Sequence, residues 1–510
     1  MAATPSFPRS SAAPVEPVRS SATRLTDPRD RTDPGGIPIR TILLGVGGVM
    51  LLALGGTGAG AILKHDPVLA DTSLSFIRYG HGHDLATAVL YLGLGMVIWS
   101  WIRHGRMVRD RLGGSAAVLT AIVAWTLPLL FAPPLFSKDI YSYLAQGQIA
   151  LNGLDPYRVG PAVLQSPLSD NVSWVWQNTP APYGPLFLML AEGVVWATGG
   201  SVIGGVVIMR IVLALGLVLL CWALPGLTRH LGGRPAVALW VAVANPLMLV
   251  HLIGGAHNDL LMVGLLAAGV LLVLDRRHVL GIAVVTLAFA VKATAVVALP
   301  FLVVVWARRL SGTRSAQLGK AIAGGVATFV AVFAATTAVS GLDLGWIPAL
   351  SSSSTIVNWL SLPSAVGDFA HTAVSAVVRV EPGWFMTIAR GLGSVLLVFI
   401  AWRQWRAAQD GGPDAVRRAA ITMLAVALLS PATLPWYFSW PLVMAAALPW
   451  TTNGLRAAAF FSTWLLLVTF PNGDTALYSW VYLVLVAAVS ALACVSLTRP
   501  DPLRLSGRYA

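Results

Sequence analysis

Long apolar segments recur along the chain and are separated by short polar breaks. A helix needs about 20 apolar residues to cross a bilayer core, so this pattern predicts an all-α polytopic membrane protein. The predicted spans are 41–63, 84–103, 115–135, 203–225, 236–252, 259–274, 279–291, 294–308, 319–340, 385–402, 417–434, 438–450, 457–470 and 477–497. The spans beside Lys292 and Trp436 are short enough to form bent hairpins, so we expect about 12–14 transmembrane helices.

The first part of the chain has a different composition. Residues 1–38 are rich in Pro, Ser, Ala, Arg and Asp and contain no apolar run, so they cannot bury enough surface to fold. The first apolar segment starts too late, and is too long, for a cleaved signal peptide. We therefore expect a disordered cytoplasmic tail over 1–38, a membrane domain over 39–498 and a cytoplasmic tail over 499–510.

The charge pattern sets the predicted topology. Only 11% of the residues are charged and the net charge is +13, whereas soluble domains carry about 25% charged residues. Many of the cations fall in short breaks between apolar runs, namely Arg103, Arg106, Arg109, Arg111, Arg276, Arg277, Arg308, Arg309, Arg403, Arg406, Arg417 and Arg418. This is the pattern of cytoplasmic loops, and it gives no basic face for nucleic acid. Both termini are then cytoplasmic, in a multi-pass protein of the plasma membrane.

The segments predicted to lie outside are 64–83, 136–202, 253–258, 341–384 and 471–476. The second is long, and in it Tyr183-Gly184-Pro185 precedes an apolar run of about 12 residues. That run is short for a span, and a crossing there would place the cations after 225 outside. We therefore expect an interfacial helix on the outer leaflet.

The most informative segment is the polar, aromatic stretch that follows the span at 115–135. Its candidate site residues are Lys138, Asp139, Tyr141 and Tyr143, followed by Asp155 and Tyr157. A carboxylate at this boundary can act on whatever reaches the membrane surface, but Asp139 can equally cap the helix 140–151. Asp155-Pro156-Tyr157 reads as a turn or as part of a site.

Cations outside the cytoplasmic breaks are scarce, so three of them are candidate phosphate ligands. Lys292 lies at the crest of a tight hairpin, where it either extends toward the interface or binds a lipid phosphate. Arg210 and Arg390 lie near the outer ends of helices. Each either extends toward the interface or binds a phosphate, for which the forked guanidinium is well suited.

Two further clusters at predicted outer helix ends combine polar and aromatic groups. His257, Asn258 and Asp259 open the helix 259–274, either as a cap or as hydrogen-bonding partners for sugar hydroxyls. Trp436 and Tyr437 belong either to the interfacial aromatic belt or to a surface that stacks on a sugar ring.

Other chemistries have little support. Cys221 and Cys494 each lie in an apolar helix and are read as small core residues. His65-Asp66 and His81 with His83 lack a compact ligand constellation, so no metal site is predicted. No phosphate-binding loop, dinucleotide fingerprint or hydrolase motif occurs in a credible context, and no cofactor is predicted.

Taken together, these motifs resemble those of the actinobacterial α-(1→6)-mannosyltransferases. These enzymes depend on polyprenyl-phosphate-mannose, belong to the GT-C superfamily and build the mannan backbone of lipomannan and lipoarabinomannan. The resemblance is carried by 137–143 with 153–157, 181–185, 255–259, 291–294 and 434–437. The segments 65–67 and 78–82 incline toward the A-type member, which extends the distal backbone, over the B-type.

The resemblance implies a GT-C glycosyltransferase-like bundle with its catalytic domain over 39–498 and its active site at the outer surface. An acidic residue in an early outer loop is the usual base of that superfamily, and this role would fall on Asp139. The pair of helices before it would be an added hairpin, and the alternative is that the loop with Asp66 takes this place; the short length of 64–83 favours the hairpin. The implied partners are a polyprenyl-phosphate-mannose donor, a lipid-anchored mannan acceptor and membrane lipids.

The main alternative is a transporter or flippase for a polyprenyl-linked saccharide. That class predicts paired half-structures and helices broken near the midplane, whereas here the polar residues cluster toward one surface and no long repeat is visible. A GT-C transferase for a different prenyl-linked sugar is a second alternative, because sugar recognition depends on a few hydrogen bonds.

Overall fold

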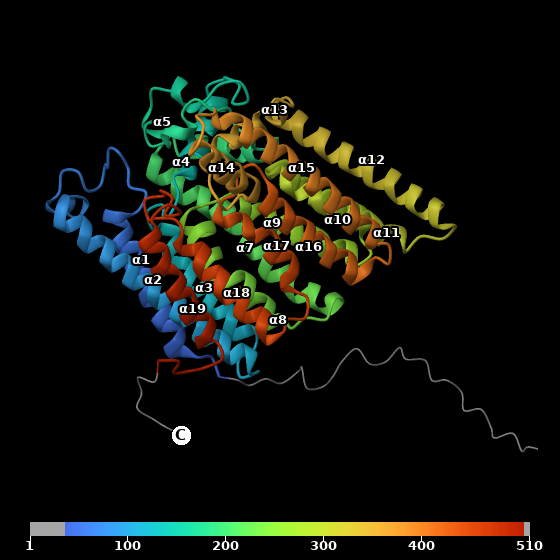
Figure 1. The fold of residues 1–510 in the computed structure, drawn as a ribbon, viewed down its shortest axis with the longest axis horizontal. Coiled ribbons are helices and arrows are strands. Elements are labelled where there is room, and N and C mark those ends of the chain that lie inside the picture. Colours follow the sequence, from blue (N-terminus) through green and yellow to red (C-terminus); the bar gives the residue numbers. More distant parts are fainter. Residues whose placement is uncertain (1–35, 504–510) are drawn as a thin grey trace, which may run out of the picture.

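The fold is known from a computed structural model, which describes residues 36–503. Most of the predicted N-terminal tail and residues 504–510 lie outside the described part. Figure 1 shows long helices that run roughly side by side in one bundle. Within 36–503 no β-strand is formed, and the protein is an all-α polytopic membrane protein, as the apolar pattern predicts.

Every predicted span coincides with helical structure. The corresponding α-helices are α1 (Ile39–Ala59), α2 (Gly80–Arg109), α3 (Ser115–Phe131), α7 (Val202–Leu231), α9 (Asp259–Leu274), α10 (His278–Val291), α11 (Leu299–Ala307), α12 (Arg314–Ser340), α15 (Pro382–Ala407), α16 (Gly412–Leu429), α17 (Ser439–Ala446), α18 (Thr452–Leu467) and α19 (Trp480–Ser496). Of these, α1, α2, α7, α12 and α15 are long and apolar enough to cross a membrane by themselves. The total of 12–14 stays a prediction.

The span predicted at 236–252 is a broken helix. It consists of α8 (Pro235–Ala238), η5 (Leu239–Val243) and η6 (Leu247–Gly254), and its two arms meet at an angle of 51°. Pro246 lies at the break, where its ring removes a backbone donor. The Asn245 side chain accepts a hydrogen bond from the Leu247 amide (3.0 Å). The second arm leads directly into the turn before α9.

Shorter helical elements lie between the spans or at their ends. They are η2 (Ser73–Arg78), α4 (Asp139–Leu151), η3 (Pro161–Val163), α5 (Pro167–Asp170), η4 (Trp174–Trp176), α6 (Pro185–Ala197), η7 (Ala293–Ala298), α13 (Trp346–Ala349), η8 (Leu350–Thr355), α14 (Leu362–Ser375) and η9 (Pro435–Phe438). In Figure 1 the labelled members α4, α5, α13 and α14 lie toward the top. Helix α6 matches the apolar run for which an interfacial position is predicted.

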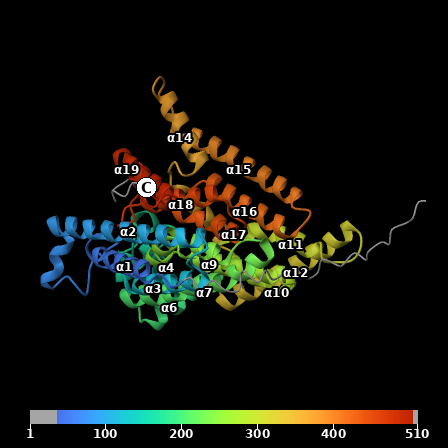
Figure 2. The ribbon, with the colours of Figure 1, turned by 90° about the horizontal axis from the view of Figure 1, so that it is seen from below.

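The first two helices form a tight hairpin on one side of the bundle (Figure 1). A side chain at Gly48 would lie 2.8 Å from the Gly93 carbonyl oxygen, and one at Gly93 would lie 2.5 Å from the Gly48 oxygen. Glycine therefore lets the two backbones touch, as small residues do between membrane helices. In Figure 2, α14 and α15 project from another side of the molecule.

Candidate active site

Asp139 is the first residue of α4, and its carboxylate does not cap the helix. Lys138 occupies the cap position, and no side chain makes a cap hydrogen bond there. The carboxylate is 17% exposed, and its Oδ2 lies 3.4 Å from Nδ1 of His257. The capping interpretation of Asp139 is therefore wrong, and the carboxylate is free to face a ligand.

Two residues with left-handed backbone conformations precede these two side chains. Phe136 has φ 60° and Ala256 has φ 56°, a backbone conformation that residues other than glycine rarely adopt. Such a conformation costs about 1–3 kcal/mol and persists only where the surroundings enforce it. The Phe136 amide donates to the Pro471 carbonyl (2.8 Å), so a third segment fixes the turn that leads to Asp139.

His257 is fully buried and lies flat against an aromatic ring. Its ring centroid is 3.7 Å from that of Trp436, and the planes differ by 19°. Within the described residues, neither His257 nitrogen has an aligned hydrogen-bond partner. The Nδ1 atom is therefore close to Asp139 and is not committed to another group.

Lys292 does not extend to the surface, because it forms a buried ion pair. Its Nζ lies 2.9 and 2.8 Å from the two carboxylate oxygens of Asp259, which is fully buried. Trp440 donates through Nε1 to the same carboxylate (2.6 Å). The ammonium group also lies 4.7 Å from the centre of the Tyr437 ring. Asp259 therefore fixes the position of a cation and does not cap α9.

A cavity of about 230 Å³ brings the carboxylate and the cation together. Asp139 and Lys292 both line it, in a wall rich in aromatic rings. The aromatic and amide members of the wall are Gln146, Trp176, Tyr183, Trp436, Tyr437 and Trp440. Burial, followed by the charge of Asp139, raises the pKa of Tyr183 well above its ordinary value, so its hydroxyl remains a hydrogen-bond donor at neutral pH.

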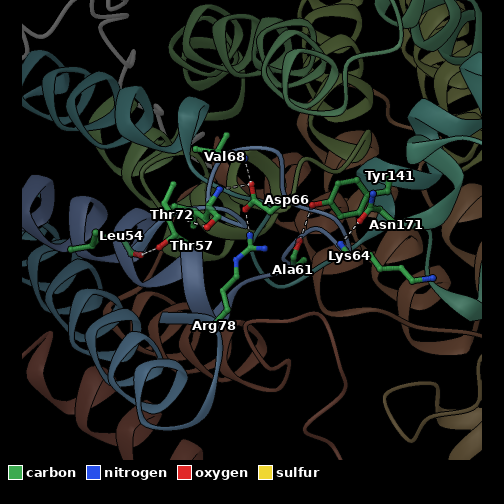
Figure 3. A network of polar contacts seen from close by, with 11 residues as sticks. Leu54, Thr57, Ala61, Lys64, Asp66, Val68, Thr72, Arg78, Tyr141 and Asn171 are labelled. Atoms are coloured by element: carbon green, nitrogen blue, oxygen red, sulfur yellow. Dashed lines mark hydrogen bonds and ion pairs between the residues drawn. The ribbon is translucent and has the colours of Figure 1, made fainter. Parts of the chain in front are cut away.

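Three tyrosines that were predicted as site residues, Tyr141, Tyr143 and Tyr157, hold the surrounding elements in place without lining the cavity. Tyr143 is buried and packs edge-on against Tyr183, with ring centroids 5.2 Å apart. The Tyr157 hydroxyl donates to the Tyr183 carbonyl (3.1 Å). The Tyr141 hydroxyl donates to the Ala61 carbonyl (2.7 Å), as Figure 3 shows. These residues anchor α4 and Tyr183 and do not line the cavity.

The structure does not bring either arginine candidate to this cavity. Arg210 is fully buried, and its guanidinium donates to the carbonyls of Ala132 and Gly254. Arg390 donates to the carbonyls of Ser354 and Ile356 (2.9 and 3.1 Å). Both arginines therefore satisfy backbone carbonyls at the ends of helices.

Two other candidates are also absent from the cavity wall. Asp155 accepts a hydrogen bond from the Tyr157 amide (2.8 Å) and pairs with Arg158 at 2.9 Å, which is the arrangement of a turn residue. Asn258 is fully buried beside His257. Its amide atoms have no partner among the described residues.

Lys138 lines a second and larger cavity of about 680 Å³, which also reaches Asp139. Its walls come from segments that are far apart in sequence, including Lys64, Trp174 and Asp474. Throughout 36–503, no group of three His, Cys, Asp or Glu side chains is arranged to hold a metal ion.

Two protein-family models match parts of this chain. Residues 42–308 match the family model described as alpha-(1->6)-mannopyranosyltransferase, N-terminal domain. The chain belongs to this family. Residues 363–499 match a second model, described as MptB C-terminal domain. Membership in the family makes the protein a mannosyltransferase, and Asp139, Lys292 and Trp436 fall within the two matched ranges.

Full-length relatives agree with this assignment. Alpha-(1->6)-mannopyranosyltransferase A of Mycobacterium tuberculosis is 42% identical over 92% of this chain and 92% of its own length. The A protein of Corynebacterium glutamicum is 34% identical over 87% and 96%, respectively. The B protein of C. glutamicum is 28% identical over 84% and 77%. The higher identities to the two A proteins favour the A-type over the B-type. No solved structure matches the chain.

Sequence reasoning missed several residues of the cavity wall. Trp440 belongs to the aromatic cluster 435–440 that the sequence shows, but it was not among the predicted site residues, although it follows Trp436 by one helical turn. Gln146 lies on α4, about two turns after Asp139, and the same periodicity applies. Trp176 ends the single turn of η4 and Thr179 follows it in a loop, and no local pattern indicates that they line the same cavity as Asp139.

Proposed function

We propose that the protein transfers mannose from a polyprenyl phosphate to the 6-hydroxyl of an α-(1→6)-mannan acceptor, with inversion at the anomeric carbon. The observation that carries the proposal is that Asp139 and Lys292 line one cavity in a chain of this family. A base for the nucleophile and a cation for the leaving phosphate are the two groups that such a displacement requires.

Asp139 acts as the general base in this mechanism. The acceptor 6-oxygen attacks C1 of the β-linked mannose as its proton passes to the Asp139 carboxylate. The bond between C1 and the phosphate oxygen breaks, and the polyprenyl phosphate departs with the electron pair. The products are an α-linked mannoside and the free lipid phosphate. General-base assistance of this kind is worth about 10²–10⁴ in rate.

Lys292 stabilises the negative charge that develops on the leaving phosphate. Its ammonium is already oriented by Asp259 and by the faces of Tyr437 and Trp440, so little reorganisation is needed during the reaction. The pair with Asp259 lowers the net local charge, and this favours release of the lipid phosphate after transfer. Arg210 and Arg390 have no part in this proposal.

The sugar is held by the aromatic wall. The rings of Trp436 and Tyr437 offer faces for stacking, and the Tyr183 hydroxyl can donate to a sugar oxygen. His257 lies behind Trp436 and orients both that indole and the Asp139 carboxylate. The acceptor would be the mannan backbone of lipomannan and lipoarabinomannan. The reaction would take place on the outer face of the plasma membrane, with both termini in the cytoplasm.

The proposal is tested with membranes that contain the protein, a labelled polyprenyl-phosphate-mannose and a short α-(1→6)-mannoside acceptor. We expect label in a product one hexose longer that an α-(1→6)-specific mannosidase releases. Transfer from a different prenyl-linked sugar, with none from the mannose donor, would refute the proposed donor. A product resistant to that mannosidase would refute the linkage.

A further inference from the structure

The cavity of about 680 Å³ reaches Asp139 but not Lys292. Asp139, Trp176 and Trp436 line both this cavity and the smaller one, whereas Lys292 lines only the smaller. An in-line displacement places nucleophile and leaving group on opposite faces of the reacting carbon. If the phosphate lies at Lys292, the larger cavity therefore offers the acceptor a place away from the leaving group.

The wall of the larger cavity has the chemistry of a site for a neutral, polyhydroxylated ligand. Neither sign of charge dominates, because the cations Lys64, Arg78 and Lys138 are matched in number by the carboxylates of Asp139, Asp170 and Asp474. Amide groups and indole rings complete the wall. Trp174 is 86% exposed, and a flat ring presented in this way can stack on the face of a sugar.

The cavity is built by contacts between distant segments. The Lys64 amide donates to the Asn171 side chain (2.7 Å), and the Asn171 amide group donates to the Pro167 carbonyl (2.7 Å). An ion pair between Asp66 and Arg78 closes the loop that carries Lys64. Figure 3 shows Lys64, Asn171 and the Asp66–Arg78 pair in one network with Tyr141. These contacts hold the wall in place before a ligand binds.

A third segment completes the wall. Asn472 donates to the Asp474 carboxylate (2.8 Å). Gly473 has φ 95° and approaches Ser137 so closely that an added side-chain carbon would lie 3.1 Å from the Ser137 Cα atom. This glycine lets the segment pack directly against the turn that leads to Asp139.

The volume of the larger cavity is roughly three times that of the smaller cavity. It falls in the range of pockets that enclose ligands larger than one sugar.

We infer that this cavity binds the acceptor as an extended chain of α-(1→6)-linked hexoses, with Trp174 as a stacking surface for a sugar remote from the reacting one. The inference rests on the proposed function, which places the donor phosphate at Lys292. It predicts that affinity grows with acceptor length, because a disaccharide leaves the region of Trp174 empty. Trp174 contacts no reacting atom and influences only how the acceptor is held.

The test compares Trp174→Ala and wild type with an α-(1→6)-mannobioside and a longer α-(1→6)-mannan oligosaccharide. We expect the KM for the long acceptor to rise about tenfold in the variant. The KM for the disaccharide, the kcat and the KM for the donor should not change. Trp174→Phe, which keeps an aromatic ring, should restore most of the affinity. Trp196→Ala removes another largely exposed indole (72%) outside the cavity and serves as the control.

Equal effects on both acceptors, or no effect on either, would overturn the inference. A change in donor KM alone would assign the cavity to the donor. Binding of the same oligosaccharide to purified protein, measured by calorimetry, separates this inference from the proposed function. If wild type transfers no mannose yet binds the oligosaccharide through Trp174, the proposed reaction falls and the acceptor cleft stands. Equal binding by wild type and Trp174→Ala refutes the cleft.

Discussion

The Nδ1 atom of His257 lies 3.4 Å from the Oδ2 atom of Asp139. The first residue of α4 and the turn before α9 thus meet, and each follows a residue in the left-handed backbone region, Phe136 or Ala256. The two strained turns point a carboxylate and an imidazole toward each other. Any base function of Asp139 therefore depends on a contact between two distant segments.

Asp139→Asn should lower kcat by about 10²–10⁴, because the amide cannot accept the acceptor proton. Thermal stability should stay near that of wild type, since the carboxylate makes no cap hydrogen bond. Initial transfer rates at equal protein amounts measure the effect. Asp84→Asn is the control, because its side chain is 78% exposed and lies outside both cavities. A variant within tenfold of wild type would remove Asp139 as the base.

His257→Phe keeps a ring that can stack on Trp436 and removes the nitrogen that faces Asp139. We expect kcat to fall about tenfold, because the imidazole that lies beside the Asp139 carboxylate is lost, with little change in either KM. His104→Phe is the matched control, because His104 is also buried but packs edge-on against Trp125, outside both cavities. If the donor KM rises with kcat unchanged, His257 contacts the donor and does not position Asp139.

Lys292→Ala should abolish most activity and also destabilise the protein. It leaves the Asp259 carboxylate buried without its cation, and breaking a buried pair costs about 3–5 kcal/mol. The double variant Lys292→Ala with Asp259→Asn should recover most of the Tm, because no isolated charge remains, but it should not recover mannosyl transfer. Lys320→Ala, an exposed lysine on α12, should match wild type. An active double variant would show that Lys292 is needed only for folding.

Arg210→Ala should lower the Tm and leave the donor KM unchanged. The substitution removes the Arg210 donor from the carbonyls of Ala132 and Gly254. The Gly254 carbonyl keeps the Leu135 amide (3.1 Å), so the main loss is at Ala132, where an unpaired buried group costs about 1–3 kcal/mol. Arg210→Lys should lie between Ala and wild type in Tm, because an ammonium cannot reach both carbonyls as the guanidinium fork does. Normal stability with a raised donor KM would instead place Arg210 at the phosphate.

Part of the site could be read from the sequence because local chemistry marks it. Asp139 stands out as a carboxylate at the end of an apolar segment, and Lys292 as a cation at the crest of a hairpin. Trp436 and Tyr437 stand out as an aromatic cluster. Sequence could not separate these residues from Arg210, because an arginine near a helix end looks the same whether it faces phosphate or backbone carbonyls. The partners of such a group depend on how the helices pack.

The sequence by itself determined the all-helical membrane class, the positions of the helices and the segments between them in which the polar residues fall. These follow from hydropathy and charge, which act locally and repeat with the length of a bilayer-spanning helix. Only the tertiary structure decided that Asp259 holds Lys292, that His257 faces Asp139 and that two cavities meet at the same carboxylate. Those relations join segments far apart in sequence, and they are set by helix packing and by two strained turns, which leave no periodic trace in the chain.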